Sequence, residues 1–221
     1  MKKRTLPDFL YEDNGIIYQS GTTTTYTGEL LLFYGEDNVK WSREHVVDGK
    51  LDGLYEMFHN ETQLSERGYY KNGKQEDLWE QFDEKGQLLN KYEFNNGKLN
   101  GLYEGYYENG QLLERINYKD GKQEGMLDGF YESGELKYKV NFENDKEEGL
   151  EEWFHTNGEL WIRKSNKKGK SHGLQEFFNE NGQLTSRGNF KDGLSDGLVE
   201  EFDEEGNLTK TEEYKDGELI E

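Results

Sequence analysis

The chain of 221 residues carries a formal net charge of −20 at pH 7 and contains no cysteine. The lack of cysteine excludes disulfides and thiolate metal sites. The negative charge opposes binding to DNA, RNA or anionic membranes, whose phosphates are normally met by basic surfaces. Leu, Ile, Val and Phe make up about 21% of the residues, close to the value of about 20% below which a highly charged chain is expected to be disordered.

Residues 1–28 precede any repetition in the sequence. They contain no apolar run of signal-peptide length, and no later segment approaches a transmembrane helix, so a cytoplasmic location is expected. Residues 16–18 and 22–26 are rich in residues that favour strands. We predict that residues 1–28 form a capping segment, in which these two stretches make a hairpin over the first repeat.

From residue 29 onward the sequence repeats with a period of 24 residues, which argues against disorder despite the composition. The aromatic residues fall at fixed positions of the repeat, and the chain has a single proline, Pro7, whereas disordered tails tend to be rich in proline. A fixed period of this kind predicts a repeat array, in which each repeat packs on its neighbours and binding occurs along a surface. The array is expected to span residues 29–221. Its eight repeats begin at Glu29, Gly53, Asp77, Gly101, Gly125, Gly149, Gly173 and Gly197.

Within each repeat, numbered 1 to 24, position 2 is Leu or Met and position 6 is aromatic. Positions 10 and 21 are mostly glycine, usually after Asn or Asp. Short aromatic-rich segments between such turn signals predict β-hairpins, with strands near positions 2–7 and 11–18. We therefore predict an all-β fold, an open antiparallel meander of hairpins in a single sheet that twists strongly, because long open sheets do not remain flat.

Two hairpin registers are consistent with the sequence. A three-residue first turn places position 6 opposite position 12, so that apolar residues at positions 2, 6, 12 and 18 share one face. A two-residue turn places position 4 opposite position 15 and aligns six pairs of opposite charge. We favour the apolar register, because a buried apolar side chain contributes about 1.5 to 3 kcal/mol and an exposed charge pair only about 0.2 to 1. The six pairs are Glu56 with Arg67, Glu80 with Lys91, Glu104 with Arg115, Asp128 with Lys139, Glu152 with Arg163 and Glu176 with Arg187.

The repeat pattern G-L-x-E-x-F/Y-x-E-N-G-Q-L-x-x-R-x-x-Y-K-D/N-G-K, clearest at residues 101–122 and 173–193, resembles the bacterial variant of the MORN repeat. The resemblance implies the hairpin fold and a scaffold for protein or lipid contact. Many such proteins are labelled YwqK-type antitoxins of toxin-antitoxin systems, so it also implies an antitoxin role. Departures from the pattern fall at Asn38, Thr62, Asp145, Asn166 and Thr211.

No residue pattern indicates catalysis. The glycines fall in hairpin turns and not between a strand and a helix, so they do not form a phosphate-binding loop. His59 and His155 lie four repeats apart and cannot share a metal ion. Acidic residues are so abundant that a pair at catalytic spacing is uninformative. We expect no enzymatic activity, no cofactor and no metal site.

A candidate contact site falls in the sixth repeat, where positions 5 and 13 are both tryptophan, Trp153 and Trp161. In the favoured register they lie opposite one another, on the face away from the apolar residues, near His155 and Phe177. Because aromatic residues are enriched in interface hot spots, these four residues are predicted to bind protein. The alternative is that they pack on one another and stiffen the sheet.

The sequence therefore predicts a non-enzymatic protein-interaction module. The acidity favours a basic protein partner, nucleic acid and membrane partners are not expected, and the resemblance implies an antitoxin or immunity role. The alternative is a structural spacer or a self-associating scaffold.

Overall fold

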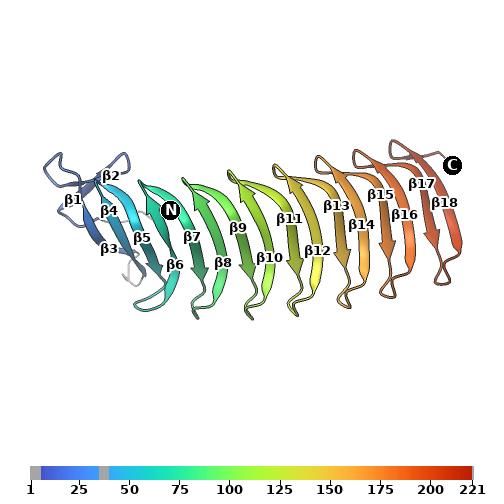
Figure 1. The fold of residues 1–221 in the computed structure, drawn as a ribbon, viewed down its shortest axis with the longest axis horizontal. Coiled ribbons are helices and arrows are strands. Elements are labelled where there is room, and N and C mark those ends of the chain that lie inside the picture. The colour runs from blue at the N-terminus through green and yellow to red at the C-terminus, as the bar shows by residue number, and fades with distance from the viewer. Residues whose placement is uncertain (1–5, 35–39, 221) are drawn as a thin grey trace. The chain divides into compact units, whose positions relative to one another are not determined.

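The computed structural model describes residues 6–34 and 40–220, which contain β-strands, turns and loops and no helix (Figure 1). The chain forms two compact units, Met1–Gly110 and Gln111–Glu221. The strands of the first unit are β1 (Leu10–Asp13), β2 (Ile16–Gln19), β3 (Gly28–Tyr34), β4 (Lys40–Val47), β5 (Lys50–Phe58), β6 (Leu64–Lys71), β7 (Lys74–Phe82), β8 (Leu88–Asn95) and β9 (Lys98–Tyr106). Those of the second unit are β10 (Leu112–Lys119), β11 (Lys122–Phe130), β12 (Leu136–Glu143), β13 (Lys146–Phe154), β14 (Leu160–Lys167), β15 (Lys170–Phe178), β16 (Leu184–Lys191), β17 (Leu194–Phe202), β18 (Leu208–Lys215) and β19 (Glu218–Leu219).

Within each unit, the strands from β3 to β9 and from β10 to β19 pair antiparallel with their neighbours in the sequence. Each sheet is therefore an open meander of hairpins, which confirms the predicted all-β fold.

The turns adopt the conformations that their residues predict. At the second turn two successive residues have positive φ, as in Asn96 at 53° and Gly97 at 82°, which is the type I′ conformation that matches the twist of paired strands. Asp145 adopts the same conformation, with a φ of 65°, without being glycine. At the first turn the Asp83 amide donates to the Gln87 carbonyl at 2.9 Å, and Gly86 has a φ of 86°. The three-residue first turn is thus confirmed. The corresponding turn at Asn38 lies outside the described residues.

Both predicted registers occur, on either side of a β-bulge, in the hairpins β5–β6, β7–β8, β11–β12, β13–β14, β15–β16 and β17–β18, whereas β3 and β4 pair without a bulge. Next to the turn, Phe130 at position 6 pairs with Leu136 at position 12, as the favoured register requires. Two residues further from the turn, Asp128 at position 4 pairs with Lys139 at position 15, as the alternative requires. The residue at position 13 is the extra residue of the bulge, so position 5 lies opposite position 14 and not opposite position 13.

Because side chains alternate along a strand, this register gives each sheet two faces of different composition. The first carries positions 2, 4, 6, 15 and 17 and is called the charged face; the second carries positions 1, 3, 5, 14, 16 and 18 and is called the core face. From the second repeat onward, the best-buried apolar residues, Trp79, Ile116 and Val140, lie at positions 3 and 16 of the core face. Leu150 at position 2 is 47% exposed on the charged face. The predicted face of positions 2, 6, 12 and 18 is therefore wrong, because the bulge turns position 18 to the opposite side.

A single sheet can bury Trp79 because neighbouring residues on the same face close over it. Its ring contacts those of Tyr55, Tyr70 and Phe94, at centroid distances of 5.5, 5.2 and 6.0 Å. The adjacent strand supplies Gly68, where a Cβ atom would lie only 2.2 Å from the indole ring. Trp79 therefore occupies the space that a side chain at position 68 would take, and only 1% of it is exposed.

The N-terminal segment packs on the first repeat. The predicted pairing of residues 16–18 with residues 22–26 is short: Thr25 bridges Tyr18, and the Tyr26 and Gln19 amides donate to the Ile17 and Thr24 carbonyls at 2.8 and 2.9 Å. The longer hairpin, which the sequence did not predict, pairs β2 with β1 over residues 10–13 and 16–19. Leu10 and Ile17 of this hairpin join Leu30, Leu32 and Val46 in one buried cluster. The hairpin thereby covers one face of β3 and β4, where positions 2 and 4 lie on the same side as positions 14, 16 and 18 because this pair of strands has no bulge.

Candidate interaction surfaces

An apolar row crosses four successive strands on the core face of the second unit. Trp153 of β13 pairs with Tyr138 of β12 on one side and with Ile162 of β14 on the other, and Ile162 pairs in turn with Phe177 of β15. The rings of Tyr138 and Trp153 lie 4.8 Å apart. All four side chains, hereafter the apolar row, are half-buried. The described elements of this unit are all strands of one sheet, so none of them forms a second layer over the row.

The structure brings together two of the four residues that the sequence predicted to bind protein. Trp153 and Phe177 lie on either side of Ile162. Trp161 is the bulge residue of β14, is 42% exposed, and has its ring 5.7 Å from that of His155. It does not lie opposite Trp153, so the predicted arrangement was wrong in this respect. The role of all four residues in binding stays a prediction.

A buried carboxylate holds Trp153 in position. Glu151, only 4% exposed, accepts hydrogen bonds from Trp153 Nε1 at 2.6 Å and from Asn166 Nδ2 at 2.5 Å, and its ion pair with Lys164 Nζ spans 3.1 Å. Asn166 stands where most repeats have an aromatic residue at position 18. The hydrogen bond that its side-chain amide donates to Glu151 accounts for this departure. A buried carboxylate is stable only when it is paired and hydrogen-bonded in this way. The network therefore fixes the position of the Trp153 indole within the apolar row.

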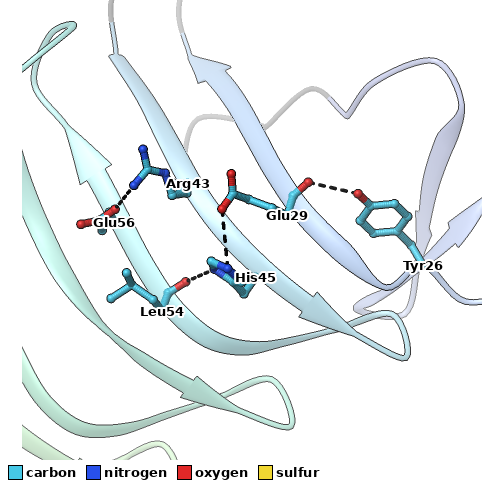
Figure 2. Close-up of polar contacts among 6 residues, drawn as sticks. All are labelled: Tyr26, Glu29, Arg43, His45, Leu54 and Glu56. Atoms are coloured by element: carbon cyan, nitrogen blue, oxygen red, sulfur yellow. Dashed lines mark hydrogen bonds and ion pairs between the residues drawn. The ribbon is translucent and has the colours of Figure 1, made fainter.

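A charge ladder, formed by the alternating residues of positions 4 and 15, runs along the charged face of both units. In the second unit Arg163 lies between Glu152 at 3.1 Å and Glu176 at 4.0 Å. In the first, Arg43 of β4 reaches Glu56 of β5 at 3.0 Å (Figure 2). Of the six predicted pairs, the five that lie within one unit are aligned. Because most of these charges have a partner of opposite sign, the ladder contributes little to the net charge of the face.

The ladder also covers the aromatic residues at position 6. The Arg187 guanidinium lies 5.5 Å from the centroid of the Phe202 ring, and that of Arg115 lies 5.8 Å from Phe130. Such cation–π contacts each contribute about 0.5 to 1 kcal/mol at exposed sites. The rings at position 6 therefore contribute to the stability of the sheet through these contacts with arginine.

Exposed apolar residues form a stripe at position 2 of the charged face. Each of these side chains is between 36 and 47% exposed. Sequence reasoning assigned them to the core, and it therefore missed an apolar surface that recurs in the six repeats from Asp77 onward, whereas Leu30 of the first repeat is buried and Leu54 of the second is half-buried. The residues are Leu78 and Leu102 in the first unit and Met126, Leu150, Leu174 and Leu198 in the second.

Among residues 6–34 and 40–220, no three His, Cys, Asp or Glu side chains are grouped so that they could hold a metal ion. This described part of the chain also lacks a helix with the length and apolar character needed to cross a membrane.

Comparison with known proteins gives one family. A family model described as "MORN repeat variant" matches residues 99–120, 124–144, 147–165, 171–192 and 195–216. No curated protein matches the chain. Among solved structures, a mutant of S. aureus TarM matches with 13% identity and a TM-score of 0.27 over 55% of this chain and 21% of that one. The chain thus spans about a fifth of the length of that structure, and at this score the likeness carries no argument.

Proposed function

We propose that the chain is a MORN-repeat protein and a non-enzymatic module that binds another protein, which is supported by the five matches to the MORN repeat variant between residues 99 and 216. The observation that carries this proposal is the apolar row, which no second layer of the described unit covers. Large half-exposed aromatic side chains on a rigid sheet are typical of interface hot spots.

Two features support a protein partner over a small ligand. The row extends over four strands on one face of a sheet, whereas small molecules usually bind in concave pockets that enclose most of their surface. In addition, the Glu151 network restricts the position of the Trp153 indole before a partner arrives, which lowers the entropy lost on binding.

The partner is proposed to be basic, and the role to be that of an antitoxin or immunity protein in the cytoplasm. A net charge of −20 attracts a basic protein over a long range and repels nucleic acid. The antitoxin role is supported by the resemblance of the repeat to YwqK-type proteins. In this role the chain would bind and block a basic toxic protein.

The test is to co-express the chain with the product of the adjacent reading frame and to measure their association by calorimetry. We expect growth to be rescued, and the affinity to fall as salt is raised. Trp153→Ala and Phe177→Ala should each weaken binding by about tenfold or more, the usual effect of a hot-spot residue. Trp161→Ala, on the same hairpin outside the row, is compared with them: no effect would confine the contact to the row, and an equal effect would place Trp161 in the contact surface as well.

Two outcomes would contradict the proposal. If growth is not rescued and the chain forms no complex with the product of the adjacent reading frame, the antitoxin role is wrong. If the pure chain instead self-associates with increasing concentration, and Trp153→Ala abolishes this, the chain is a self-assembling scaffold.

A further inference from the structure

Two neighbouring hollows of the first unit share the side chain of Leu78. The apolar hollow, of about 370 Å³, lies between Leu54, Tyr69 and Leu78, with Arg67 also lining it. The acidic hollow, of about 400 Å³, is lined by Leu78 together with Glu76, Asp77 and Glu93. They differ in chemistry, so a ligand that fills both must be apolar at one point and cationic at the next.

The apolar hollow offers contact area for aliphatic groups. Tyr69 and Leu78 are 50% and 44% exposed, and Leu54 pairs with Tyr69 across β5 and β6. The charged groups that also line this hollow are already paired, Arg67 with Glu80 and Glu56 with Arg43. The leucine and tyrosine side chains are therefore the groups with surface left to bury.

The acidic hollow has negative charge that no neighbouring cation balances. No lysine or arginine is among its lining residues, and within the described parts of the chain neither Asp77 nor Glu93 has an ion pair. Glu76 accepts one hydrogen bond, from the Asn96 amide at 2.7 Å, which leaves its charge without a counterion. The hollow is thus complementary to a cation.

This composition is particular to the repeat that begins at Asp77. The repeats that begin between Gly53 and Gly197 otherwise have glycine at this position, and Asp77 adopts a φ of 57°, a left-handed conformation that is unfavourable for residues with a Cβ atom. At position 19 this repeat has Asn95, where five other repeats have lysine. The repeat has therefore gained acidic charge and lost basic charge at one place, at the expense of backbone strain.

We propose that the two hollows bind a segment of a partner polypeptide that carries lysine or arginine next to an aliphatic residue. The aliphatic residue enters the apolar hollow, and the stem of the basic side chain lies along Leu78 while its charged end meets Asp77 and Glu93. This inference rests on the proposed protein-binding function, and it adds a contact point for a basic partner in the first unit, separate from the apolar row.

The probe is a short labelled peptide in which leucine and arginine alternate, added to the isotope-labelled full chain and followed by anisotropy and NMR. We expect shift changes at Tyr69, Leu78 and Glu93, and loss of binding when glutamate replaces arginine or serine replaces leucine in the peptide. Asp77→Gly should weaken binding on the order of tenfold, as removal of a charge partner does, without loss of stability, because glycine relieves the positive φ.

Matched controls exist elsewhere in the array. Glu213→Gln changes an acid at the same repeat position as Glu93, and Leu150→Ser changes a leucine at the same position as Leu78; both should leave peptide affinity unchanged. Equal affinity of the Asp77→Gly variant, or shift changes confined to the second unit, would overturn the inference. Loss of self-association in Leu78→Ser, with no peptide binding by the unaltered chain, would assign the hollows to a second copy of the chain and also overturn it. Peptide binding that persists when the adjacent gene product does not bind would leave the hollows valid and remove only the antitoxin role.

Discussion

Replacing Gly68 with alanine tests how a single sheet buries a tryptophan. An added Cβ atom would lie 2.2, 2.3 and 2.6 Å from the Cδ2, Cε2 and Cγ atoms of Trp79, well inside van der Waals contact. The indole ring of Trp79 cannot move away freely, because it is in contact with the rings of Tyr55, Tyr70 and Phe94. Overpacking of this kind costs about 1 to 3 kcal/mol. Displacement would also lengthen the hydrogen bond from Trp79 Nε1 to the Tyr69 carbonyl, now 3.2 Å, which contributes about 1 kcal/mol.

We therefore expect Gly68→Ala to destabilise the first unit by about 2 to 4 kcal/mol. The matched variant is Gly188→Ala at the same repeat position in the second unit. There the nearest atom to the new Cβ would be a methyl group of Val199 at 3.1 Å, so a small shift suffices and the cost should stay below about 1 kcal/mol.

The assay is native-state hydrogen exchange in increasing urea, because repeat arrays need not unfold in one step and exchange reports each unit separately. Amides of β6 and β7 should lose protection in Gly68→Ala and not in Gly188→Ala. A second change, Trp79→Leu, should restore part of the stability lost in Gly68→Ala, since the smaller side chain frees the space. Equal effects of the two alanine variants, or no recovery in the double variant, would refute the reasoning.

Three further predictions concern other polar groups. Glu151→Leu should destabilise the second unit by about 3 kcal/mol or more, because two buried donors lose their acceptor, whereas Glu151→Gln should cost less, as thermal unfolding would show. Arg163→Met should cost about 0.5 to 1 kcal/mol at low salt and almost nothing in molar salt, measured by urea unfolding; a salt-independent loss would contradict the ion-pair assignment. Burial and the neighbouring Glu104 raise the pKa of Tyr106 to about 12, so this group's contribution to stability should be intact below pH 10 and lost as the pH rises towards 12; an ultraviolet titration that gives an ordinary pKa would disprove this.

The hairpins could be predicted because the repeat fixes its turns locally. An Asn-Gly or Asp-Gly pair selects the type I′ conformation through its own backbone preferences, whatever surrounds it. The first turn was predictable for the same reason, since Gly86 and its counterparts supply the left-handed residue that closes a three-residue loop. Asp145 and Lys168 adopt positive φ without being glycine, at 65° and 54°, which shows that the paired strands can impose the turn where the sequence is weak.

The faces could not be predicted, because they depend on the bulge at position 13. No residue type marks this position: it is Ser65, Lys137 or Trp161 in different repeats. Each register was weighed as a whole, by the apolar contacts or by the charge pairs that it creates. The bulge satisfies both, since the apolar pair at positions 6 and 12 lies on one side of it and the charge pair at positions 4 and 15 on the other.

The candidate site was predicted in part for the same reason. Trp153 and Phe177 share position 5 of successive repeats, so any register places them on one face of the sheet. Their shared neighbour Ile162 lies at position 14, which the expected register did not place opposite position 5. Comparing repeats at position 14 as well as at position 5 would have indicated the apolar row.

The register also indicates where in the repeat binding can evolve. Positions 3 and 16 fill the best-buried part of the core face, and positions 4 and 15 form the ladder that joins the strands, so changes there affect stability. Positions 5 and 14 contribute less to the core and vary most: around Gln81 of the first unit they are polar, with Gln81 bonded to Glu66 and Asn90, whereas four of them in the second unit form the apolar row. Positions 2 and 17 are also tolerant, because they lie exposed between ladders. A partner that distinguishes this chain from other arrays with the same repeat pattern is therefore expected to contact these two pairs of positions. Exchanging the side chains of positions 5 and 14 between the two units should move binding to the first unit while both units stay folded.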